Sequence, residues 1–312
     1  MARKQSFKNV RTVLFEQDSD LRQNIKSTLT QDTFTQTTAM SALKSAQAAM
    51  HNDEADLILV DIDKENVEIC DLMRRIRHNE VGKNPFPVAI AMSGDSDYKN
   101  VRKAINAGFD VLLLKPFSMS TLLDRIHHLM VERSPFAVTS DYIGPDRRQR
   151  ATGRKRGRQT PMVTVPNPLK AMATGDISPG QLRRRIEKTI TEINDRRVEC
   201  HAETITDVVG RLMPKFMHHE LDAAFVEDLK KLREISRDMD RRLARSKFAP
   251  VAGLCASMGS VVARILESPV TPRSKDMDLL QTLSIAIDRA FLGDEAEAAL
   301  AYGISDAIRA NA

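Results

Sequence analysis

The sequence predicts an α/β domain built on a doubly wound, five-stranded parallel sheet, followed by an all-α helical bundle. In the N-terminal part, short apolar runs alternate with segments of helical periodicity. The apolar runs lack polar alternation, as expected of strands that are covered on both faces. Beyond Ser178 the apolar residues recur every three or four positions over long segments, which is typical of packed amphipathic helices.

The predicted strands end in polar side chains. The apolar run from Leu57 to Val60 is unbroken and ends at Asp61. In a parallel sheet this places Asp61 in the crevice beyond the carboxyl end of a strand, where open α/β sheets bind their ligands. The other elements follow in βα order, with strands over residues 11–15, 34–37, 87–92 and 111–114 and helices over residues 20–29, 41–50, 68–77, 97–107 and 118–131.

Three other strands bring a set of polar groups to the same edge. The first, fourth and fifth strands run into Glu16, Ser93 and Lys115. Because the carboxyl ends of parallel strands meet at one edge, these groups are expected near Asp61. A carboxylate can attack a phosphoryl donor, and a lysine and a hydroxyl can bind phosphoryl oxygens.

This spacing resembles that of the receiver domain of two-component response regulators, over residues 8–134. The resemblance implies a flavodoxin-like strand order, Asp61 as the phosphoacceptor, and Ser93 and Lys115 beside the phosphoryl group. It also implies a bound Mg²⁺ ion. The ligands expected for that ion are Glu16, Asp18, Asp61 and the backbone of Asp63.

Several positions depart from the family pattern, among them Glu65 and Ile69, where a proline and a glycine are usual. Gln17 stands where the second of two adjacent metal-binding acids is usual, so Mg²⁺ affinity is expected to be weakened unless Asp18 turns inward to substitute. Leu112 stands at the aromatic switch position, so rotation of an aromatic ring cannot report phosphorylation. A receiver retained only as a docking module is therefore an alternative to a phosphorylated one.

Residues 135–177 are predicted to form a basic, irregular linker. From Ser140 to Gly175 the chain has eight basic and two acidic residues, with several glycines and prolines. A solvated tether is one interpretation, and binding of nucleic acid phosphates is another. Its start, Asp141 to Arg148, is similar to a short motif of bacterial receiver proteins, and Tyr142 and Ile143 are expected to pack on the last receiver helix.

Residues 178–312 are predicted to form a bundle of about five helices. The first is one long helix or two in line, with its apolar stripe interrupted near Arg197 and His201, and a second begins after Pro214. The region is weakly similar to histidine phosphotransfer domains. It lacks their histidine followed by lysine and glycine, and Arg237 is the nearest equivalent position. The further helices are expected over residues 251–266, 276–292 and 294–309.

The cysteines and the apolar stretches of the sequence indicate the cellular compartment. The three cysteines, Cys70, Cys200 and Cys255, form no Cys-x-x-Cys pair, which favours a reducing compartment without structural zinc. The sequence contains no apolar stretch of membrane-spanning length, so a cytoplasmic location is predicted.

These observations predict a signalling protein and not an enzyme. The expected donor of the phosphoryl group is a histidine kinase or a histidine phosphotransfer protein. The helical domain is expected to bind a downstream protein or to pair with a second copy. The alternatives are a phosphorylation-independent adaptor and a transcription regulator that contacts DNA through the basic linker.

Overall fold

The computed structural model describes residues 6–52, 55–63, 68–94, 98–147, 162–243 and 251–292. The chain divides into two compact units, Met1–Ile190 and Thr191–Ala312, called here the N-terminal and C-terminal units. The division falls within a helix, and so differs from the predicted boundary at residue 178. Each unit is described by itself.

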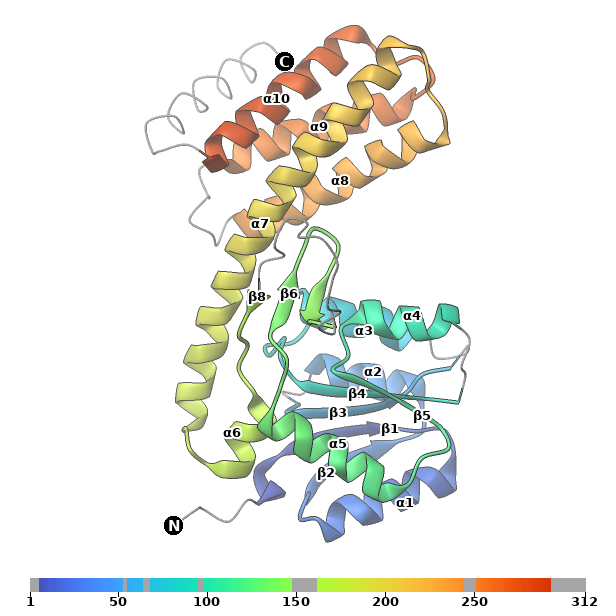
Figure 1. The fold of residues 1–312 in the computed structure, drawn as a ribbon, viewed down its shortest axis with the longest axis vertical. Coiled ribbons are helices and arrows are strands. Elements are labelled where there is room, and N and C mark those ends of the chain that lie inside the picture. The colour runs from blue at the N-terminus through green and yellow to red at the C-terminus, as the bar shows by residue number, and fades with distance from the viewer. Residues whose placement is uncertain are drawn as a thin grey trace, which may run out of the picture. The chain divides into compact units, whose positions relative to one another are not determined.

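The N-terminal unit is built on a five-stranded sheet whose strands are all parallel, in the order β2-β1-β3-β4-β5 (Figure 1). This confirms the predicted doubly wound fold. The central strands β3 and β4 are buried along their whole length, which explains their unbroken apolar sequences. The strands are β1 (Arg11–Phe15), β2 (Gln36–Met40), β3 (Leu57–Asp61), β4 (Val88–Ser93) and β5 (Val111–Leu114).

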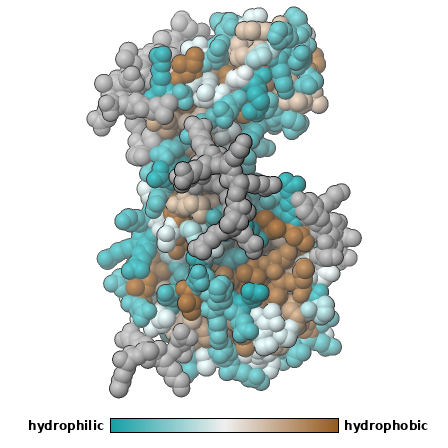
Figure 2. Space-filling view, viewed as in Figure 1, coloured by the Kyte–Doolittle hydropathy of each residue, from teal (hydrophilic) through white to brown (hydrophobic). Residues whose placement is uncertain are grey.

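Five helices cover the two faces of this sheet. Buried residues of α1 and α5 pack on one face, and buried residues of α2, α3 and α4 pack on the other. The side chains of Asp18 and Ser118 cap the first turns of α1 and α5. Figure 2 shows apolar residues gathered on the surface near β4 and β5. The helices are α1 (Ser19–Gln31), α2 (Leu43–Asn52), α3 (Glu68–Arg77), α4 (Tyr98–Ala107) and α5 (Met119–Val131).

The prediction of an irregular linker over 135–177 was wrong for the described part of that segment. A small antiparallel sheet has the order β7-β6-β8, so Pro145 lies on an edge strand, where a missing N–H group is tolerated. Pro168 lies in the first turn of a helix and Gly175 ends it at φ +64°. Residues 148–161 lie outside the described residues. The elements are β6 (Phe136–Val138), β7 (Ile143–Pro145), β8 (Met162–Val163) and α6 (Pro168–Thr174).

These additions pack on the receiver-like sheet and its helices. Strand β7 contacts α3, and the expectation that Tyr142 and Ile143 pack on the last receiver helix stays a prediction. At the other end, the 3₁₀ helix η1 (Phe7–Asn9) and α6 contact each other, and the Phe7 ring stacks on Phe34 with a centroid distance of 4.2 Å. The N-terminal unit therefore extends beyond residue 134.

Helix α7 (Pro179–Met217) is continuous and passes from one unit into the other. The predicted interruption near Arg197 and His201 does not break the helix, because both side chains are buried in an ion-pair cluster within the C-terminal unit. The second helix predicted after Pro214 is present, but it begins only at Ala223, since α7 contains this proline and ends three residues later.

The C-terminal unit packs the second half of α7 with three further helices around one aliphatic core (Figure 1). The predicted helix over residues 294–309 lies outside the described residues. Among the helices that the structure describes, none is long and apolar enough to cross a membrane. The three helices are α8 (Ala223–Leu243), α9 (Ala252–Glu267) and α10 (Ser274–Leu292).

Candidate phosphorylation site

The carboxyl ends of the parallel strands bring together the groups that the sequence predicted. The Lys115 Nζ atom lies 2.8 Å from Asp61 Oδ1 and 2.7 Å from Glu16 Oε2. Ser93 is buried at the end of β4, between the strands that lead to Asp61 and Lys115. The Lys115 backbone N–H donates to the Ser93 carbonyl at 2.8 Å, which ties the two ends together. One ammonium group is thus shared by two carboxylates.

The site is held at the boundary between core and solvent. Asp61 is 5% exposed and Glu16 is fully buried, whereas the Lys115 side chain is 21% exposed. Burial raises the pKa of both carboxyl groups, and the hydrogen bonds from Lys115 offset this only in part. For Lys115 the same hydrogen bonds outweigh burial and raise its pKa. The site therefore pairs a charged amine with carboxylates of enhanced basicity.

The residues next to Glu16 decide how well a cation can be held. The Asp18 side chain caps α1, since its Oδ1 accepts a hydrogen bond from the Leu21 N–H at 2.7 Å. Gln17 is exposed. Asp63 is half-buried, and its negative charge contributes to the raised pKa of Asp61. Among the described residues there is no group of three or more acidic, histidine or cysteine side chains that could hold a metal. Asp18 as a ligand stays a prediction.

The donor set that is present still fits a hard divalent cation. Glu16 and Asp61 carboxylate oxygens contact the same ammonium nitrogen, so they converge on one point that carries positive charge. Mg²⁺ is bound in proteins by one or two carboxylates, with water filling the other positions. Two carboxylates without a charged group at position 17 therefore define a weak site.

Sequence reasoning missed two aspartates at the opposite edge of the sheet. Asp56, directly before β3, accepts from the Arg11 N–H at 2.9 Å and donates its own N–H to the Arg11 carbonyl at 2.9 Å. Asp110, directly before β5, likewise accepts from the Ala89 N–H of β4 and donates its own N–H to the Ala89 carbonyl. Each aspartate thus makes the first pair of hydrogen bonds between two neighbouring strands. An acid at the start of an apolar run was the signal in the sequence.

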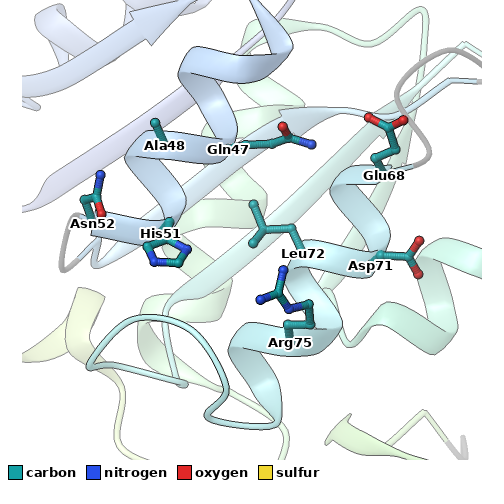
Figure 3. Close-up of a pocket in the computed structure, with 8 residues that line it drawn as sticks. All are labelled: Gln47, Ala48, His51, Asn52, Glu68, Asp71, Leu72 and Arg75. Atoms are coloured by element: carbon teal, nitrogen blue, oxygen red, sulfur yellow. The ribbon is translucent and has the colours of Figure 1, made fainter.

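A concavity lies between α2 and α3 (Figure 3). It has a volume of about 500 Å³, and none of the six predicted site residues lines it. Its walls carry Gln47 and His51 from α2 and Glu68, Asp71 and Arg75 from α3. These five side chains are at least partly exposed, so the concavity is a surface groove and not an enclosed pocket.

Comparisons with known proteins agree with this geometry. Residues 13–127 match the model of the response regulator receiver domain family. The chain thus carries a receiver domain in its N-terminal part, and this domain implies two-component signalling with histidine kinase or phosphotransfer partners. A search of curated proteins found no match. The similarity of the helical region to histidine phosphotransfer domains is not confirmed.

Three solved structures each match less than half of this chain. A response regulator of Thermotoga maritima is 24% identical, with a TM-score of 0.33, and the match covers 39% of this chain and 99% of that one. An orphan response regulator of H. pylori is 22% identical, with a TM-score of 0.31 and coverage of 38% and 95%. A CpaE2 pilus assembly protein of Sinorhizobium meliloti is 16% identical, with a TM-score of 0.29 and coverage of 38% and 98%.

Proposed function

We propose that this protein is a two-component signalling protein whose receiver accepts a phosphoryl group on Asp61. The donor is a phosphohistidine of a histidine kinase or a phosphotransfer protein. The observation that carries the proposal is the position of Lys115 Nζ, 2.8 Å from Asp61 and shared with Glu16. A lysine between two carboxylates is placed to bind the oxygens of a group transferred to either one.

The transfer needs little more than placement of these groups. An Asp61 carboxylate oxygen attacks phosphorus, a new P–O bond forms, and the P–N bond of the phosphohistidine breaks, with the electron pair leaving on the imidazole. Lys115 offsets the negative charge of the phosphoryl oxygens, and Ser93 lies at the neighbouring strand end as a hydroxyl donor. When bound at Glu16 and Asp61, with the Asp63 backbone, Mg²⁺ supplies further neutralisation of that charge.

Replacing Asp61 by asparagine is expected to abolish hydroxylamine-sensitive labelling by radioactive acetyl phosphate in the presence of Mg²⁺. The amide cannot form an acyl phosphate, and asparagine keeps the size of the side chain. Labelling of the full-length chain is measured on gels, with Asp71→Asn on α3 as the control that should label normally. Equal labelling of the Asp61→Asn variant, or no label on the folded wild-type protein, would contradict the proposal.

Replacing Gln17 by aspartate is expected to raise the apparent affinity for Mg²⁺ at least about tenfold, or about 1.4 kcal/mol. The change adds a carboxylate next to Glu16, which with Asp61 would hold the ion. The measurement is the Mg²⁺ concentration that gives half-maximal labelling, together with direct calorimetric titration. Gln23→Asp, on the exposed surface of α1, is the matched control. Equal affinity in the Gln17→Asp and Gln23→Asp variants would show that position 17 does not face the ion.

The second candidate function is a receiver that docks its partner without phosphorylation. Gln17 favours this alternative, since it is exposed and uncharged at a metal-binding position, and Leu112 favours it because it cannot act as an aromatic switch. Under this alternative the Asp61→Asn variant binds the downstream partner as the wild type does.

We further infer that the signal leaves through the C-terminal unit, by contact with another protein or with a second copy of this chain, in the cytoplasm. DNA contact through the basic segment between β7 and β8 is the competing route. It would show as binding to duplex DNA that weakens steeply with salt.

A further inference from the structure

The strands that carry Ser93 and Lys115 are joined at their opposite ends by Asp110. Its backbone N–H donates to the Ala89 carbonyl at 2.7 Å, and its Oδ2 accepts from the Ala89 N–H at 2.9 Å. From this point β4 and β5 run side by side to Ser93 and Lys115. A shift of one residue in their register would turn the side chains of one strand to the opposite face. Asp110 therefore fixes the register on which the phosphoryl-binding groups depend.

Two buried arginines hold Asp110 in this position. Arg77 of α3 donates to Asp110 Oδ2 at 3.0 Å, and Arg133 donates to Oδ1 at 2.8 Å. The same guanidinium groups bind backbone carbonyls of residues 85–87, the segment that enters β4, at 2.8 to 2.9 Å. The Arg77, Arg133 and Asp110 side chains are 0%, 4% and 1% exposed. We call these three residues the arginine clamp.

The β6–β7 hairpin supplies an aromatic ring that packs against both arginines. The Cζ atoms of Arg77 and Arg133 each lie 5.0 Å from the centroid of the Phe136 ring, which is fully buried on β6. The hairpin also approaches the chain before β5 closely. At Gly108, with φ +87°, a Cβ atom would lie 3.0 Å from the Ile143 carbonyl oxygen of β7. The hairpin and the clamp thus form one packed body.

We propose that Phe136 and Asp110 are positioning residues for the phosphorylation site, so that the β6–β7 hairpin sets the placement of Ser93 and Lys115 through the arginine clamp. The consequence for phosphoryl transfer rests on the function proposed above. The route runs along β4 and β5 and does not use the aromatic switch, whose position is occupied by Leu112. At the same edge, Asp56 and Arg11 join β3 to β1, the strands that lead to Asp61 and Glu16. Phe136 contacts Arg77, Arg133 and Phe86, the last of which lies in the segment that enters β4.

The test compares Phe136→Ala with Phe34→Ala in the full-length chain. Both rings are buried in the N-terminal unit, and Phe34 stacks on Phe7 beside β2, away from the clamp residues. The first readout is amide hydrogen exchange at Lys115, whose N–H donates to Ser93, and at Glu16, whose N–H donates to Met40 of β2. Global destabilisation would speed exchange at both amides equally. Phe136→Ala is expected to speed exchange at Lys115 at least about tenfold more than at Glu16, whereas Phe34→Ala should not.

The second readout is the rate of labelling by acetyl phosphate. A displacement of about 1 Å in a catalytic group can cost on the order of 100-fold in rate, so Phe136→Ala is expected to label at least about tenfold more slowly than Phe34→Ala. Phe136→Leu, which keeps an apolar side chain against the arginines, should recover part of the labelling rate. Asp110→Asn should label as slowly as Phe136→Ala.

The failures of the two proposals can be told apart. If the wild-type protein takes no label, the proposed function fails, and hydrogen exchange still decides whether the hairpin places Lys115. Uniform exchange changes in the Phe136→Ala variant would overturn the positioning role. So would selective exchange at Lys115 with an unchanged rate of labelling.

Discussion

Replacing Asp110 by alanine is expected to lower the free energy of unfolding of the N-terminal unit by about 3–5 kcal/mol. The change removes the acceptor for two buried guanidinium groups, Arg77 and Arg133, and leaves their charges without compensation. It also removes the acceptor of the Ala89 N–H at the start of β4. The measurement is urea unfolding followed by circular dichroism and by hydrogen exchange of β4 and β5 amides.

The control for this prediction is Asp71→Ala on α3, whose side chain is exposed and which should change the stability by no more than about 0.5 kcal/mol. Double replacement of Arg77 and Arg133 by methionine in the Asp110→Ala background should recover part of the loss, because apolar side chains need no buried counter-ion. A loss below about 1 kcal/mol in the Asp110→Ala variant would show that the clamp does not stabilise the unit.

Replacing Asp238 by alanine is expected to destabilise the C-terminal unit by about 3–5 kcal/mol, which is a large part of the stability of an ordinary domain. Asp238 Oδ2 accepts from His201 Nε2 at 2.8 Å, Arg242 at 2.9 Å and Arg197 at 3.0 Å. These three partners are nearly fully buried. Without the carboxylate, two guanidinium groups remain in the core. Urea unfolding monitored by hydrogen exchange of α7 and α8 amides measures the loss.

The same prediction has a pH dependence with a definite sign. Burial alone would raise the pKa of Asp238, but the hydrogen bond from His201 and the charges of Arg242 and Arg197 outweigh it and lower the pKa. A lowered carboxyl pKa contributes stability above the unfolded value, about pH 4, and that contribution is lost as the pH falls further. The Asp238→Ala variant should lack this part of the acid sensitivity. The exposed Asp240→Ala variant should retain it; equal acid profiles in the two variants would contradict the assignment.

The buried cluster also bears on the histidine of α7. Burial lowers the pKa of His201, and the hydrogen bond to Asp238 offsets this only in part, so the imidazole is neutral at neutral pH. At 1% exposure its ring has no access to a phosphoryl donor. The geometry thus favours a structural role for His201 in holding α7 on α8.

The sequence by itself determined the receiver fold and which strand ends carry the candidate site residues. Unbroken apolar runs that end in Asp61, Ser93 and Lys115 suffice, because the period of a strand and the parallel order of the sheet bring those ends to one edge. Only the tertiary structure decided how residues 135–177 are used and why Arg197 and His201 lie on an apolar stripe. Glycine, proline and charge report local preferences, and these predict loops and exposed surfaces. Burial of Phe136 against two arginines, or of Asp238 against two arginines and a histidine, depends on partners far apart in the sequence, and no local pattern records those contacts.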